Sequence, residues 1–133
     1  MGTLLRTCDA VGACLAVPAT DHYRDALACG DTLIERSCIH EVAPSQIAWV
    51  AAEQERGTRI LAVELAEDAT PLPRLQPARE RTVVLLGHEH HGIPEGVWDL
   101  LDEVVEIPMV GRGASLNVAV AGSLVLYRLA GLA

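Results

Sequence analysis

The apolar positions of this chain recur with two different spacings, which predicts a succession of helices and strands. At the start, Leu4, Leu5, Cys8 and Val11 fall on one helical face, and Gly12 is a natural stop for that helix. Short runs that are apolar almost throughout predict buried strands. The predicted strands are 13–18, 58–65, 81–87 and 103–109, and the predicted helices after the first are 42–57, 93–102 and 114–132.

The order of these elements predicts the fold class. Helices and strands alternate along most of residues 1–133, which is typical of a single α/β domain with a parallel sheet and helices on both faces. The strand at 81–87 is apolar almost throughout, as central parallel strands are. Residues 19–43 are mixed, with one possible short helix, and residues 66–80 hold three prolines and predict a surface loop.

Composition and charge limit the kinds of protein to which this chain can belong. Half of the 133 residues are apolar, there is no Phe, and aromatics make up 3%, so the core must be built from Leu, Val, Ile and Ala. The net charge of −8 is opposite in sign to that of proteins that hold nucleic acid by phosphate neutralisation, although a local basic patch stays possible. No signal peptide opens the chain and no apolar run approaches the ~20 residues of a membrane helix. We therefore expect a cytoplasmic protein without a membrane partner.

Cysteines and histidines are the candidate metal ligands. The four cysteines are Cys8, Cys14, Cys29 and Cys38. No two of them form a C-x-x-C pair, so we expect reduced, half-buried thiols rather than a zinc site. His88, His90 and His91 flank Glu89, but adjacent loop histidines point in different directions. We expect no metal there, and contact with RNA or simple exposure both remain open for the histidines.

Three glycine- or acid-bearing loops follow the last predicted strands. They read "ELAEDAT" at 64–70, "GHEHHGIPE" at 87–95 and "IPMVGRGASLN" at 107–117. Ligands of parallel α/β sheets bind beyond the carboxyl ends of the strands, and glycine lets backbone approach a ligand closely. The three loops are therefore predicted to form one cleft.

The residues of these loops resemble a known family. "VVLLGHEHHGIP" followed by "EIPMVGRGASLNVAVAGSLVLY" is similar to the SpoU-like (TrmH-type) branch of the SPOUT superfamily, the RNA ribose 2′-O-methyltransferases. The family's second motif, G-x-E-x-x-G, matches Gly87, Glu89 and Gly92, and its third matches Ile107, Pro108, Met109, Ser115, Leu116, Asn117 and Val118. Its first motif, N-x-G-x-x-x-R-T, matches Gly2, Arg6 and Thr7. The resemblance covers nearly the whole chain in order.

The resemblance implies a fold and a cofactor. In this family the C-terminal segment is threaded through an earlier loop as a deep trefoil knot, in which S-adenosylmethionine lies bent and is held mostly by backbone. A helix beginning at Ser115 and rich in small residues suits a knot wall, because threaded backbones must approach closely. Glu64 and Leu65 would form a further wall. The implied cofactor-binding residues are Leu65, Gly87, Ile107, Met109, Ser115 and Leu116.

The resemblance also implies a reaction and partners. The family methylates a ribose 2′-hydroxyl of tRNA or rRNA and works as a homodimer. Arg6 would steady the developing alkoxide, because an arginine is a reluctant base. Glu89 and Asn117 would orient Arg6 or the ribose, and Ser115 would bind cofactor or acceptor. Arg6 could instead be a solvated helix residue, and Ser115 and Asn117 could be N-caps of the last helix.

Two features depart from the family pattern. The first-motif asparagine and the strand that leads into it would fall before Met1, so the sheet is expected to lack its first strand. The chain is also acidic, without the basic extension of many family members. These departures leave a second hypothesis, namely a knotted dimeric module that binds S-adenosylmethionine or a protein partner without catalysis.

Overall fold

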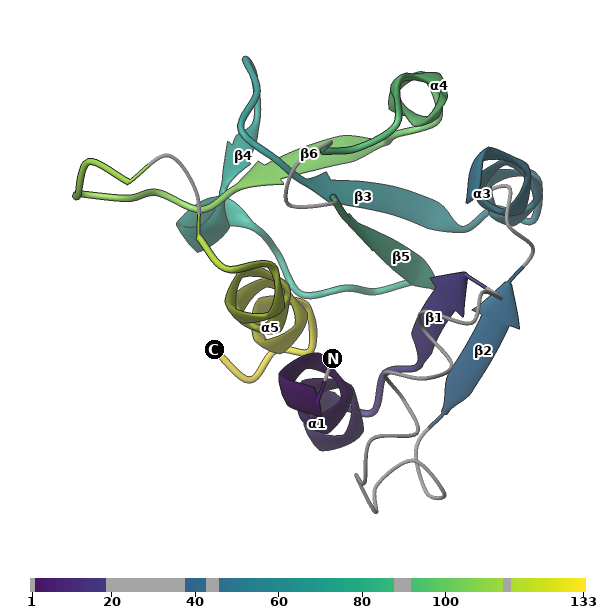
Figure 1. Ribbon diagram of the computed structural model, residues 1–133, viewed down its shortest axis with the longest axis horizontal. Helices are drawn as coiled ribbons and strands as arrows, with labels where there is room; N and C mark the ends of the chain where they lie inside the picture. The colour runs from purple at the N-terminus through teal and green to yellow at the C-terminus, as the bar shows by residue number, and fades with distance from the viewer. Residues whose placement is uncertain (1, 19–37, 43–45, 88–91, 114–115) are drawn as a thin grey trace.

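A computed structural model describes residues 2–18, 38–42, 46–87, 92–113 and 116–133 (Figure 1). The elements are α1 (Gly2–Val11), β1 (Leu15–Pro18), β2 (Ile39–Val42), α3 (Gln46–Glu55), β3 (Arg59–Val63), β4 (Thr70–Pro71), the 3-10 helix η2 (Leu72–Arg74), β5 (Thr82–Leu86), α4 (Glu95–Trp98), β6 (Glu103–Glu106) and α5 (Val118–Leu129). The possible helix within 19–37 lies outside the described residues. Among the helices described, none has the length and apolar character needed to cross a membrane.

The strands form two parallel sheets. One pairs β1 with β2, and the other has the order β4-β6-β3-β5. The predicted α/β class with parallel strands is therefore confirmed. The central place given to strand 81–87 is wrong. β5 ends the order of its sheet and its five residues are only half-buried, whereas β3 is paired on both sides. An apolar run shows that a strand is covered, but it does not identify its neighbours.

Helices cover both faces of the larger sheet, as predicted. Alternate residues of β3 point to opposite sides of the sheet. Ile60 and Ala62 are fully buried in a cluster with Val50 of α3. Leu61 is fully buried on the other side with Val125 of α5. In Figure 1 the sheet accordingly lies between α3 and α4 on one side and α5 on the other.

The helix α5 is tightly packed against α1 and the edge strand β5. Thr7 of α1 and Ser123 of α5 share a hydrogen bond of 2.7 Å between their hydroxyls. A Cβ added to Gly122 would lie 2.7 Å from Leu86 Cδ1 and 3.3 Å from Leu4 Cδ1. An alanine at this position would require these leucine side chains to shift. The atoms nearest to Gly122 are thus the flexible ends of side chains, and not the closely approaching backbone that a knot wall implies.

Several element boundaries differ from the predictions. The last helix begins at Val118 instead of at Ser115, because Asn117 is its N-cap. The helix predicted over 93–102 is a single turn, Glu95–Trp98. The strand β2 was not predicted, because its sequence IHEV is too short to show a period. The predicted loop at 66–80 contains the short elements β4 and η2.

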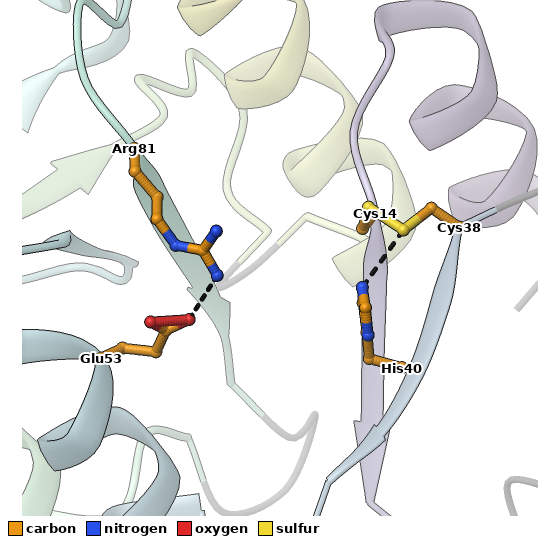
Figure 2. Close-up of a disulfide and its surroundings, with 5 residues drawn as sticks. All are labelled: Cys14, Cys38, His40, Glu53 and Arg81. Carbon is orange, nitrogen blue, oxygen red and sulfur yellow. Dashed lines mark hydrogen bonds and ion pairs between the residues drawn. A yellow bond between two sulfur atoms is a disulfide. The ribbon is translucent and has the colours of Figure 1, made fainter. Parts of the chain in front are cut away.

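Two of the cysteines are not the reduced thiols that were expected. Cys14 and Cys38 form a disulfide, shown in Figure 2, with their Cα atoms 4.5 Å apart. They meet because β1 and β2 pair with Leu15 opposite Ile39, which places the two preceding residues side by side. Cys8 is a free thiol and is buried rather than half-buried, and this burial raises its pKa. Cys29 lies outside the described residues.

A buried carboxylate joins α3 to the start of β5. Glu53 is only 3% exposed, and Arg81 donates a 2.7 Å hydrogen bond to its Oε1 (Figure 2). The Thr58 hydroxyl donates to its other oxygen at 3.3 Å, and Arg56 lies 3.5 Å away. The hydrogen bond from Arg81 is the main cause that lowers the pKa of Glu53. This charged cluster therefore fixes the end of α3 against the sheet.

Candidate active site

The parallel register brings three loops to one edge of the larger sheet. β3 pairs with β5 from Arg59 opposite Thr82 to Val63 opposite Leu86, and β3 pairs with β6 in the same direction. The carboxyl ends of these strands therefore lie together. The chain leaves them at residues 64, 87 and 107, and we call the segments 64–69, 87–94 and 107–117 the carboxyl-edge loops.

Gly87, which begins the second carboxyl-edge loop, lies in close contact with the backbone of Gly92 and Ile93. A Cβ added to Gly87 would lie 2.9 Å from the carbonyl carbon of Gly92 and 3.2 Å from the nitrogen of Ile93. These are backbone atoms, so only glycine fits at residue 87. Gly92 has a φ of +64°, which is favourable for glycine and strained for other residues. Gly87 and Gly92 thus place two residues without side chains at the end of β5.

The first carboxyl-edge loop contacts both of its neighbours. The backbone N–H of Glu64 donates to the carbonyl of Val105 in β6 at 3.1 Å. Toward the second loop, a Cβ added to Gly92 would lie 3.2 Å from Glu64 Oε2. Glu64 therefore lies between the second loop and β6. Sequence reasoning treated Glu64 only as a wall beside Leu65, and its contact with Gly92 depends on strand order that periodicity does not reveal.

Apolar side chains of the first and third loops are exposed to solvent. Leu65 is 69% exposed, Met109 45% and Leu116 37%. Val110, which was not among the predicted site residues, is fully exposed. Ile107 is half-buried instead and packs against the cluster that contains Val125. The third loop is therefore anchored in the core at its start and carries uncovered apolar groups beyond it.

Asn117 has a defined structural role at the end of the third loop. Its Oδ1 accepts hydrogen bonds from the backbone N–H groups of Ala119 at 2.9 Å and Val120 at 3.3 Å. Asn117 is thus the N-cap of α5, which was the alternative interpretation of this residue. Its amide NH2 remains chemically able to donate to a ligand, because the cap uses only the oxygen.

The remaining predicted site residues fall in different parts of the chain. Arg6 is exposed on α1, next to Thr7, whose hydroxyl contacts Ser123 of α5. The helix that carries Arg6 therefore packs directly on the helix that Asn117 caps. Glu89 and Ser115 lie outside the described residues, as do His88, His90 and His91.

A groove of about 720 Å³ lies elsewhere, between α1 and α5. It is lined mainly by apolar groups and hydroxyls, among them Thr7, Val120, Leu124 and Tyr127. None of the described residues that were predicted for the site lines it. The groove is therefore a surface distinct from the carboxyl-edge loops.

These features define an α/β protein with close-packed glycine backbone at the carboxyl edge of its sheet, the edge at which parallel α/β sheets bind their ligands. Residues 1–127 match the model of the SpoU rRNA Methylase family, and the chain belongs to that family. The family resemblance inferred from the sequence motifs is therefore confirmed.

Known relatives cover almost all of the chain. It is 32% identical over 133 residues to the tRNA (guanosine(18)-2′-O)-methyltransferase of Thermus thermophilus, an alignment that covers 96% of this chain and 66% of that enzyme. The crystal structure of the A. aeolicus TrmH/SpoU tRNA modifying enzyme has a TM-score of 0.79 and 26% identity, over 98% of this chain and 66% of that one.

A further solved relative contains a cofactor. The SpoU methyltransferase AviRb from Streptomyces viridochromogenes, in complex with AdoMet, has a TM-score of 0.74 and 27% identity, over 98% of this chain and 51% of that one. This chain therefore spans about half to two thirds of the length of these three relatives.

Proposed function

We propose that this chain is the catalytic domain of an S-adenosylmethionine-dependent RNA methyltransferase that modifies a ribose 2′-hydroxyl of tRNA or rRNA. The observation that carries this proposal is the carboxyl edge of the sheet. There the two glycines of the G-x-E-x-x-G motif, Gly87 and Gly92, lie in backbone contact, on the same edge of the sheet as the loop that holds Ile107 and Met109. The relatives named above as a tRNA (guanosine(18)-2′-O)-methyltransferase and a SpoU methyltransferase support the reaction class.

The described residues fit the proposed cofactor. A nucleoside that is held mostly by backbone needs backbone atoms that no side chain covers, and Gly87 and Gly92 have no side chains of their own at the end of β5. The exposed side chains of Leu65, Met109 and Leu116 are suitable walls for an adenine ring, because they lose water when they are covered. S-adenosylmethionine would supply an activated methyl group, so the protein must orient the acceptor and stabilise charge.

The polar residues have separate proposed tasks. Arg6, on α1, would stabilise the alkoxide that develops on the ribose, as a fixed positive charge can do without giving up a proton. Asn117 would orient the ribose or Arg6 through its amide NH2 while its oxygen caps α5. Glu89 would orient Arg6 or the ribose, and Ser115 would bind cofactor or acceptor; both assignments rest on the motifs alone.

We also propose that the chain is knotted and dimeric. The third loop and α5 carry the knot motif, and Gly122 allows α5 to lie close against Leu86 and Leu4. Val120 and Leu124 form a short exposed apolar row on α5, with the four-residue spacing of one helical face. A second copy would cover this row, and light scattering should then give twice the 14.2 kDa mass of the chain. A monomeric mass at micromolar concentration would count against dimerisation.

Replacement of Arg6 tests the reaction. Arg6→Ala should abolish methyl transfer to total tRNA and rRNA from tritiated S-adenosylmethionine, and should leave the calorimetric Kd for the cofactor within about threefold. Arg79→Ala is the control, because Arg79 is equally exposed but lies in the loop before β5. Loss of cofactor binding in the Arg6 variant would mean that Arg6 is structural. Cofactor binding without transfer in the unaltered chain would favour the non-catalytic module instead.

A further inference from the structure

Three potential metal ligands converge on the smaller sheet, away from the carboxyl-edge loops. Cys14 and Cys38 lie side by side at the start of β1 and β2, and His40 follows on β2 two residues after Cys38. Residues two apart on a strand point to the same face, so Cys38 and His40 share one side of β2. Figure 2 shows the His40 ring directed at the sulfur of Cys38. All three residues are exposed to solvent.

The distances between the ligand atoms suit a small ion. His40 Nε2 lies 3.2 Å from Cys38 Sγ, and the ligand atoms of all three residues lie within 4.8 Å of one another. A tetrahedral zinc ion has bonds of about 2.3 Å to sulfur and 2.0–2.1 Å to nitrogen, which requires a sulfur–nitrogen separation of about 3.6 Å and a sulfur–sulfur separation of about 3.8 Å. Once the disulfide is opened, rotation about the Cα–Cβ bonds of the two cysteines can supply this geometry.

We propose that the reduced form of this cluster binds a thiophilic divalent metal ion, with Zn²⁺ as the best match, through Cys14, Cys38 and His40. A dithiol reductant first gives two electrons and two protons to the disulfide, which yields two thiols and a cyclic disulfide of the reductant. Zn²⁺ then displaces both thiol protons and binds two thiolates and one neutral imidazole, while water occupies the fourth position. The exposure of the cluster provides access for that water and for the ion.

The proposed ion would hold together two segments that are separate in the sequence. Cys14 lies three residues after the end of α1, the helix that carries Arg6, whereas Cys38 immediately precedes β2 and His40 lies on that strand. A bound ion would therefore link the end of α1 to β2 in the reduced protein, as the disulfide links them in the oxidised protein. The sequence alone argued against zinc, because no two of its four cysteines form a C-x-x-C pair. The convergence of Cys14, Cys38 and His40 depends on the pairing of β1 with β2.

Cobalt provides a spectroscopic test on the full chain. The protein is reduced under inert gas, freed of reductant and titrated with Co²⁺. The reduced protein should show a thiolate-to-cobalt charge-transfer band and the intense visible bands of a tetrahedral site, and Zn²⁺ should displace both. Cys14→Ser, Cys38→Ser and His40→Ala should each weaken cobalt binding at least tenfold. Cys8→Ser is the matched control, because Cys8 is a buried thiol of α1 outside the cluster, and should bind like the unaltered protein.

Two further readouts do not depend on the folding of a variant. At a hundredfold excess over its Kd, Zn²⁺ should raise the Tm of the reduced protein by about 10 °C, a value that follows from the ligand-linkage relation and a typical unfolding entropy. The Tm of the oxidised protein should not change. Zn²⁺ should also slow the alkylation of Cys14 and Cys38 in the unaltered chain. The proposal is overturned if the reduced protein shows no charge-transfer band, if alkylation is as fast with Zn²⁺ as without it, or if His40→Ala binds cobalt as tightly as the unaltered protein.

Discussion

Replacement of Gly87 by Ala is the sharpest test of the carboxyl-edge loops. In the structure, the added methyl group would lie 2.9 Å from the carbonyl carbon of Gly92, 3.1 Å from its Cα and 3.2 Å from the nitrogen of Ile93. Non-bonded carbon atoms pack best at about 3.5–4.0 Å, so the shortfall is at least about 0.6 Å. The obstructing atoms are backbone and cannot rotate away, so the second loop must move as a unit.

The size of the effect follows from this geometry. Overpacking of a methyl group against a closely packed site costs about 1–3 kcal/mol, and the backbone contact places Gly87→Ala in the upper half of that range. A typical unfolding entropy of about 2.1 cal/mol/K per residue gives about 0.28 kcal/mol/K for 133 residues. We therefore expect the Tm to fall by about 7–11 °C. Cofactor affinity should fall at least tenfold, because the displaced loop provides the proposed cofactor surface.

The assay pairs this variant with a control from the third loop. Gly111 is an exposed glycine without a positive φ, and a Cβ added there would meet no atom within 4 Å. Gly111→Ala should therefore change the Tm by less than about 2 °C, which is the usual range of surface substitutions. Thermal unfolding by circular dichroism and calorimetry with S-adenosylmethionine measure both quantities. If Gly87→Ala matched Gly111→Ala in Tm and in Kd, the close approach of Gly87 and Gly92 would be refuted.

Two further predictions concern stability. Glu53→Gln should lower the free energy of unfolding by about 1–2 kcal/mol at neutral pH, because Arg81 and Arg56 lose a charged partner. The pKa of Glu53 is lowered in the folded state, so this stabilisation should be present above the unfolded pKa of about 4.3 and be lost as the pH falls through the folded pKa. Urea titrations of both proteins between neutral and acid pH measure the difference in unfolding free energy. A difference that does not change with pH would contradict the assignment. Asn117→Ala should lower the Tm by about 4 °C through loss of the α5 cap, while Asn117→Asp should retain it. Equal losses in the two Asn117 variants would mean that the cap contributes little.

The sequence by itself determined the local elements and the family. Apolar periodicity located α1, α3, α5 and the strands β1, β3, β5 and β6, because burial of one face of an element produces a regular spacing of apolar residues within a short stretch of chain. The G-x-E-x-x-G and I-P-M motifs identified the loops that the register of β3, β5 and β6 brings together. A motif is also local, so its residues can be read without knowledge of the strand order.

Only the tertiary structure decided which distant residues meet. Gly92 lies against Glu64, Glu53 binds Arg81, and Cys14 joins Cys38, and each pair comes from segments that a sequence pattern treats separately. The position of β5 at the end of its sheet was likewise not predictable, because its apolar run is compatible with several orders of strands. Periodicity reports how one segment is buried, whereas strand order and register decide which segments it is buried against.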